Sequence, residues 1–234
     1  MENFPETVQD FLDGQILLIN KPLGWTSFDV VKKIKNLIRT KYSLKKLKVG
    51  HAGTLDPLAS GLLIVCTGKF TKRISELQGQ AKVYTGDITL GGTTPSYDLE
   101  TEIDIKFETN HISENLIKET TAQFTGEIEQ KPPIFSALKR GGERLYEKAR
   151  RGEKFEIEAR KVSVHSFDIT AIEMPKVGFE IKCSKGTYIR SIAHDFGAAL
   201  NSGAHLSELC RTAIGDYQLT DALEVSDFEK QLNS

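Results

Sequence analysis

The sequence predicts an α+β protein with a mixed, mainly antiparallel sheet core and flanking helices. Runs typical of strands outnumber runs typical of helices, and they do not alternate strictly, as they would in a parallel β–α–β protein. Hydrophobic residues make up 39% of the chain and charged residues 27%, which is typical of a soluble globular protein. The length of 234 residues fits one large domain or two small ones, and a single catalytic domain is the simplest partition.

Short strands and helices are expected to follow one another in the first part of the chain. The apolar run Gln15–Asn20 predicts a strand that ends at a Lys-Pro-Leu-Gly turn. Thr26 and Ser27 can cap a helix, because apolar residues then recur at helical spacing from Phe28 to Ile38. Three further elements are expected: a buried strand at Leu62–Thr67, a short helix at Thr71–Gln78 and an alternating strand at Ala81–Leu90.

An excursion at Gln130–Gly152 interrupts the second part of the chain. Pro132 and Pro133 force an extended stretch, a Gly-Gly pair breaks it, and Glu143–Arg150 is compatible with a helix. The other elements expected are helices at Ile112–Phe124, Thr187–Leu200 and Val225–Leu232, and strands at Arg160–Glu173, Val177–Ser184 and Leu206–Leu219.

Charge is segregated along the chain, although the formal net charge is only -1. Val30–Lys48 holds eight basic residues and no acid, and Lys131–Lys161 holds ten basic residues against five acidic ones. Between them, Asp87–Glu129 holds ten acids and two lysines. The pattern is compatible with a basic face that binds nucleic acid, but solvated helix faces produce the same kind of run.

Several classes of site lack sequence support. The three cysteines, Cys66, Cys183 and Cys210, lie far apart, which excludes a disulfide framework and a cysteine zinc site and suits a reducing cytosol. The five histidines are scattered, and the glycine-rich loops that bind nucleotides are absent. The N-terminus is acidic where a signal peptide would be basic, and no apolar run approaches the roughly 20 residues of a membrane span. We therefore expect a cytoplasmic protein with no metal and no cofactor.

The segment Gly50–Gly68, GHAGTLDPLASGLLIVCTG, is the strongest candidate for a site. Its glycines and Pro57 make a rigid loop before an apolar strand, and loops mounted on strands often carry function. The loop holds one carboxylate, Asp56, and one imidazole, His51. Asp56 is compatible with a plain Asp-Pro turn, with a catalytic carboxylate, or with a metal-independent hydrolase that pairs it with His51.

Four segments, in order, resemble the bacterial tRNA pseudouridine(55) synthases, the TruB family of pseudouridine synthases. They are NKPLGWTSFDVV at Asn20–Val31, GHAGTLDPLASGLL in the Asp56 loop, QKPPIFSALKRGGERLYEKARRG at Gln130–Gly152, and CSKGTYIRSIAHDFG from Cys183 with GAHLSELCRTAIG from Gly203. The resemblance runs from about residue 14 to 216. It implies the pseudouridine synthase fold, with an insertion that grips the tRNA T arm.

The resemblance implies an enzyme that converts the T-loop uridine to pseudouridine by breaking the N1–C1′ bond and forming C5–C1′. Asp56 matches the essential nucleophile, although it is open whether the carboxylate adds to C1′ or removes a 2′ proton to give a glycal. Arg190 matches the arginine that pairs with this aspartate and keeps it ionised. Tyr84 matches a tyrosine that stacks on the flipped base, and Tyr188 a second tyrosine that helps remove the C5 proton.

The resemblance also assigns supporting residues. Leu209 lines the base pocket, His51 helps to extrude the base, and Lys21 beside Pro22 supports the catalytic loop. Asp98, in TTPSYDLE, resembles an aspartate near the site, but the glycine usual soon after it is missing. Two further substrate-binding residues, Lys139 and Arg150, lie in the insertion expected to contact the T arm.

The expected partner is the T stem-loop of tRNA, with no membrane and no obligatory protein partner. The given chain ends within about 20 residues of the last motif, so we expect no full C-terminal PUA domain. The alternative function is an RNA-binding chaperone that folds tRNA and whose catalysis is secondary. The basic segments suit either function, because both need contacts to RNA phosphates.

Overall fold

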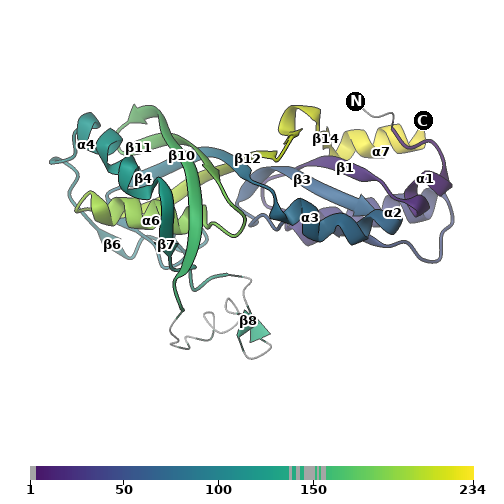
Figure 1. Ribbon diagram of the computed structural model, residues 1–234, viewed down its shortest axis with the longest axis horizontal. Coiled ribbons are helices and arrows are strands. Elements are labelled where there is room, and N and C mark those ends of the chain that lie inside the picture. The colour runs from purple at the N-terminus through teal and green to yellow at the C-terminus, as the bar shows by residue number, and fades with distance from the viewer. Residues whose placement is uncertain (1–3, 137–138, 141–142, 145–150, 152, 154–156) are drawn as a thin grey trace. The chain divides into compact units, whose positions relative to one another are not determined.

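The computed structural model describes residues 4–136, 139–140, 143–144, 151, 153 and 157–234, and these form two compact units (Figure 1). Unit 1 comprises Met1–Tyr84 with Leu209–Ser234, and unit 2 comprises Thr85–Glu208. The division falls inside two long strands, β4 (Lys82–Leu90) and β12 (Ala204–Ile214). The single catalytic domain expected from the sequence stays a prediction.

The remaining elements belong to one unit each. Unit 1 contains α1 (Val8–Asp13), β1 (Ile16–Lys21), α2 (Ser27–Lys41), β2 (Val49–His51), β3 (Ala59–Thr67), η1 (Gly68–Arg73), α3 (Ile74–Gly79), β13 (Tyr217–Gln218), η3 (Leu219–Asp221), β14 (Leu223–Glu224) and α7 (Val225–Asn233). Unit 2 contains β5 (Gly92–Thr93), β6 (Ile105–Lys106), α4 (Glu114–Thr120), η2 (Thr121–Phe124), β7 (Gly126–Gln130), β8 (Lys139–Arg140), β9 (Glu143–Arg144), β10 (Arg160–Glu173), β11 (Lys176–Cys183) and α6 (Ile189–Ala199).

Ten strands form one mixed sheet in the order β14-β1-β3-β12-β4-β11-β10-β7, with β2 beside β3 and β13 beside β12. The pairs β1–β3, β2–β3, β7–β10, β10–β11 and β12–β13 are antiparallel. The pairs β1–β14 and β3–β12 are parallel. The predicted α+β class with a mixed, mainly antiparallel sheet is therefore confirmed.

Strand β3 forms the centre of unit 1, because both of its faces are buried. Leu63 and Val65 pack into one apolar cluster with α2 and α7, whereas Leu62 and Ile64 pack into a second cluster with Leu77 of α3. A strand buried on both faces reads as a continuous apolar run, which is why LLIVCT was recognisable in the sequence. The strand actually begins three residues earlier than predicted, at Ala59.

Helix α2 begins as the sequence predicts and packs along one face. Thr26 is the N-cap, and its side chain and that of Asp29 each accept a hydrogen bond from the other's backbone N–H. Ile34 and Ile38 are fully buried, as the spacing predicts. Phe28, which also fitted the apolar spacing, is instead exposed, so the buried stripe starts at Val30.

Unit 2 is built on the antiparallel hairpin of β10 and β11, whose strands match the predicted ranges within a residue. Helix α6 packs on this hairpin through aromatic side chains, and the ring centroids of Phe167 and Phe196 lie 5.3 Å apart. Phe179 and Phe124 extend the same cluster. This core positions the first turn of α6, where Arg190 lies.

The sequence-based expectations differ from the structure mainly in short elements. Glu143–Arg144 forms strand β9 against β8 rather than the start of a helix, and residues 145–150, including Arg150, lie outside the described residues. Lys139 lies in β8. Helix α1 was not predicted, because its six residues are too few for a clear period, although Thr7 and Asp10 form a capping box. In the described part of the chain, no helix is both long and apolar enough to cross a bilayer.

Candidate active site

The loop 52–58 that carries Asp56 leaves β2 and enters β3, and its ends are tied by backbone hydrogen bonds. The Ala52 N–H donates to the Ile64 carbonyl at 2.9 Å, and the Ala59 N–H donates to the Asp56 carbonyl at 3.1 Å. Asp56 itself is half-buried. The tight turn at Asp56–Ala59 therefore places Asp56 just before a strand of which all residues but Ser60 are buried.

A second segment, Pro22–Ser27, forms hydrogen bonds with this loop. The Gly24 N–H donates to the Pro57 carbonyl at 2.8 Å. The Ser27 hydroxyl accepts a hydrogen bond from the Leu55 N–H at 2.8 Å and donates to the Leu55 carbonyl at 3.2 Å. Pro22–Ser27 is therefore hydrogen-bonded to the loop on both sides of Asp56, at Leu55 through the first residue of α2 and at Pro57 through Gly24.

Lys21 lies between this segment and the loop, and its side chain is fully buried. Its ammonium donates to the carbonyls of Trp25 at 2.6 Å and Pro22 at 3.0 Å, with a longer contact to Pro57. Burial lowers the pKa of Lys21 to about 8, and the negative charge of Asp56 acts against that decrease. Lys21 therefore supports the loop through these hydrogen bonds, and its ammonium also brings a positive charge near the Asp56 carboxylate.

The pKa of Lys21 predicts how stability depends on pH. The folded protein releases this proton near pH 8, whereas an unfolded lysine keeps it to about pH 10.5, so the unfolded state binds more protons in between. The free energy of unfolding should therefore rise with pH across that window, by up to about 3 kcal/mol from this group.

Urea unfolding at several pH values, for wild type and Lys21→Met, measures this effect. We expect the rise in stability from pH 8 to about 10.5 to be larger in the wild type than in the variant, since other titrating groups are common to both. Parallel curves for the two proteins would show that the ammonium keeps its ordinary pKa.

Arg211 is a buried residue that the sequence analysis missed. Its guanidinium donates to the Leu62 carbonyl at 2.8 Å and to the Gly53 carbonyl at 3.0 Å, so it joins β12, β3 and the Asp56 loop. Gly61, opposite Arg211 in the parallel β3–β12 pair, has φ +103°, and a Cβ there would collide with the Arg211 backbone. The available signal was an arginine between two apolar residues, Leu209 and Ala213, that share its face of the strand.

Three more of the predicted residues lie in unit 1. Leu209 of β12 is buried in register with Ala59, three positions after Asp56, which places it beside the base of the loop. Tyr84 is a buried residue of β4. His51 ends β2, and burial lowers its pKa, so its imidazole is neutral at neutral pH.

Arg190 lies in the first turn of α6 in unit 2 and is buried with Asp98. Its Nε lies 3.6 Å from the Asp98 carboxylate, and its two terminal nitrogens donate to the carbonyls of Ser96 at 3.2 Å and Phe135 at 3.0 Å. Asp98 in turn accepts a hydrogen bond from the Glu100 N–H at 3.0 Å. The guanidinium is thus held in one orientation by the Ser96–Asp98 turn and by Phe135 at the start of the insertion.

Tyr188 is the residue that precedes α6. The Gln130 side chain accepts from its N–H at 2.8 Å and donates to its carbonyl at 3.0 Å. The guanidinium of Arg160 stacks over its ring at 4.8 Å from the centroid. Gln130 and Arg160 therefore orient Tyr188, and neither was singled out from the sequence.

The structure gathers the predicted residues into two groups. Unit 1 holds Lys21, Asp56 and Leu209 around one loop, with His51 and Tyr84 on strands of the same unit. Unit 2 holds Arg190, Asp98 and Tyr188 around the start of α6. The pairing of Arg190 with Asp56 stays a prediction. Among the described residues, no group of three His, Cys, Asp or Glu side chains is placed to hold a metal ion.

Solved structures with the same fold define the class of protein. A Cbf5 complex with Nop10 and Gar1 matches with a TM-score of 0.70 and 29% identity, over 96% of this chain and 56% of that chain. An H/ACA RNP bound to a substrate RNA that contains 2′-deoxyuridine matches with a TM-score of 0.67 and 28% identity, over 94% and 53%. This chain spans about half the length of those chains. The fold is that of the pseudouridine synthases.

The family follows from the sequence comparisons. A model described as TruB family pseudouridylate synthase (N terminal domain) matches residues 39–189, and a tRNA pseudouridylate synthase B C-terminal domain matches residues 190–234. The chain belongs to the TruB family. The tRNA pseudouridine synthase B of Flavobacterium johnsoniae is 62% identical over 97% of this chain and 99% of its own. That of Phocaeicola vulgatus is 50% identical over 96% and 95%.

Proposed function

We propose that this protein isomerises the uridine of the tRNA T loop to pseudouridine. Family membership along most of the chain supports the proposal, because relatives named tRNA pseudouridine synthase B match it over nearly their full lengths. The structural observation that supports the proposal is the way in which the loop of Asp56 is held. Its loop is held by Lys21, Ser27 and Arg211, while Asp56 keeps part of its surface exposed.

The reaction requires an ionised carboxylate at the sugar. The N1–C1′ bond breaks, the base turns, and C5 bonds to C1′, so no group is gained or lost and no cofactor is consumed. Asp56 either adds to C1′ or removes the 2′ proton, and both routes use the carboxylate form. Lys21 favours that form, because with a pKa of about 8 it carries a positive charge at pH 7.

Other residues receive roles in binding and turning the base. Tyr84 stacks on the everted uracil, because stacking on an aromatic ring is worth roughly 1–3 kcal/mol per base. Leu209 lines the pocket that holds the base. Neutral His51 helps to hold the base out of the loop. Tyr188 assists removal of the C5 proton, and Arg190, fixed by Asp98, orients and ionises Asp56.

Binding energy from the tRNA backbone offsets the cost of turning the nucleotide out of its stack. That cost is a few kcal/mol, and contacts to phosphates and to RNA shape supply the compensation. Lys139 and Arg150 in the insertion contact the T arm in this proposal. The partner is therefore the T stem-loop of tRNA, bound in the cytoplasm without an obligatory protein partner.

Mapping of pseudouridine in tRNA tests the proposal directly. Unmodified tRNA transcript is incubated with the purified protein in buffer without metal or cofactor, and modified positions are identified by reverse-transcription stops after carbodiimide treatment. We expect one new pseudouridine, in the T loop. A tRNA that stays unmodified, or is modified elsewhere, contradicts the proposed substrate.

A further inference from the structure

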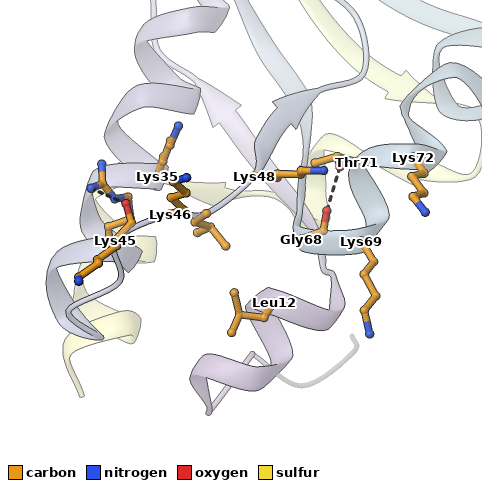
Figure 2. A pocket seen from close by; sticks show the side chains of 11 residues that line it. Leu12, Lys35, Lys45, Lys46, Lys48, Gly68, Lys69, Thr71 and Lys72 are labelled. Carbon is orange, nitrogen blue, oxygen red and sulfur yellow. Dashed lines mark hydrogen bonds between the residues drawn. The ribbon is translucent and has the colours of Figure 1, made fainter.

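A basic groove lies in unit 1, in a part of it that the proposed chemistry does not use. Its cations come from α2 (Lys35, Arg39), from the segment after α2 (Lys45, Lys46, Lys48) and from η1 (Lys69, Lys72). Figure 2 shows these segments arranged around Leu12, and the groove has a volume of about 640 Å³. No carboxylate is among the residues that line it.

The groove is built by specific backbone contacts. The Arg39 guanidinium donates to the carbonyls of Leu44 at 3.1 Å and Lys45 at 3.0 Å, which fixes the segment that carries three lysines. The Gly68 N–H donates to the Lys48 carbonyl at 2.9 Å, which joins that segment to η1. Gly68 has φ +51°, and a Cβ there would collide with the backbone of Leu12. The lysines are therefore presented by a preformed backbone.

Most of this positive charge is not neutralised within the described residues. Lys69 pairs with Asp13 at 2.6 Å. For Lys35, Lys45, Lys46, Lys48 and Lys72, no described carboxylate lies within 4.0 Å of the ammonium nitrogen. Like charges held together in a concave surface repel one another and attract a multivalent anion. The groove thus has the electrostatics of a polyanion site.

The groove is remote from the proposed nucleophile. Asp56 precedes β3, and Gly68 follows it, so the nine residues of the strand separate the two. At about 3.3 Å per residue, β3 alone places the groove roughly 25 Å or more from the Asp56 loop. It cannot touch the nucleotide on which Asp56 acts.

We propose that the basic groove binds the phosphodiester backbone of the tRNA outside the T stem-loop. The inference rests on the proposed function, which supplies a long polyanion anchored at one point, the target nucleotide. A second contact far from that point adds affinity without reading sequence, as lysine–phosphate contacts do. Lysines suit this role, because they bind phosphates as mobile point charges rather than through fixed bidentate geometry.

The triple variant Lys46→Gln/Lys48→Gln/Lys72→Gln tests the groove. We expect its affinity for full-length tRNA to fall about tenfold or more, and the slope of log affinity against log salt to become shallower by about 2, because about three phosphate contacts are lost. Affinity for, and turnover of, an isolated T stem-loop should match the wild type, since that RNA does not reach the groove.

A matched control carries the same change in charge elsewhere. Lys106→Gln/Lys118→Gln/Lys230→Gln replaces three exposed lysines that do not line the groove and should leave both RNAs bound as in the wild type. Full-length tRNA bound by the groove variant with unchanged affinity and slope would overturn the inference, as would an equal loss for the T stem-loop. Wild-type turnover of the T stem-loop tests the proposed function independently of the groove.

Discussion

Asp56→Asn should abolish pseudouridine formation, with a rate at least about 10⁴-fold below that of the wild type. Asparagine has nearly the same shape as aspartate, but its amide neither adds to C1′ nor removes a proton from C2′. Both open routes therefore fail for the same reason. The fold should survive, because the loop is held by Lys21, Ser27 and Arg211 rather than by the reacting carboxylate alone. Single-turnover assays on tRNA measure the rate.

The matched control for this variant is Asp216→Asn, at an exposed turn of the same unit, which should keep wild-type activity. Filter binding and tRNA-folding assays on Asp56→Asn separate the enzyme from the chaperone alternative. A variant that binds and folds tRNA without modifying it is consistent with both activities in one protein. Residual turnover within about tenfold of wild type would remove Asp56 from the role of nucleophile.

Arg190→Met should destabilise the protein by about 3–5 kcal/mol, because it leaves the buried Asp98 carboxylate without its cation. It also removes the donors to the Ser96 and Phe135 carbonyls, at 3.2 and 3.0 Å. A buried acceptor without a donor adds to the cost. Urea unfolding compares the variant with wild type, and the protein that remains folded should form little or no pseudouridine.

Two further variants show whether the unpaired charge of Asp98 causes the loss of stability in Arg190→Met. Arg190→Met/Asp98→Asn should recover part of the stability, because asparagine is neutral and its carbonyl oxygen can still accept from the Glu100 N–H. Arg73→Met removes a partly exposed arginine that pairs with Glu76 and should cost no more than about 1 kcal/mol. If the double variant is no more stable than the single one, the ion pair between Arg190 and Asp98 is not the source of the effect.

Arg190→Met also tests the predicted pairing with Asp56. A neighbouring guanidinium lowers the pKa of a carboxyl, so its removal should raise the pKa of Asp56 and shift the acidic limb of the pH–rate profile to higher pH. An unshifted limb would mean that Arg190 acts on the site without charge pairing to Asp56.

Elements with a long, regular period were predictable from the sequence. The strands Arg160–Glu173 and Lys176–Cys183 and the helix Val225–Asn233 match their predicted ranges within about a residue, because side-chain alternation and helical spacing are local properties. The six-residue helix α1 and the two-residue strands carry too few residues for a period, so they were missed. Phe28 fitted the spacing of α2 but is exposed, since spacing alone does not say where a buried stripe begins.

The sequence by itself determined the class of fold, the family, and the loop that carries Asp56, because each of these depends on the order of residues along a short segment. Only the tertiary structure decided which distant residues support that loop and which of the chain's cations gather in the basic groove. Arg211 lies 158 positions from Gly53, and Arg190 lies 94 from Ser96. The residues next to a position in the sequence determine which face of its strand or helix it occupies. The pairing of strands determines which distant residue it contacts.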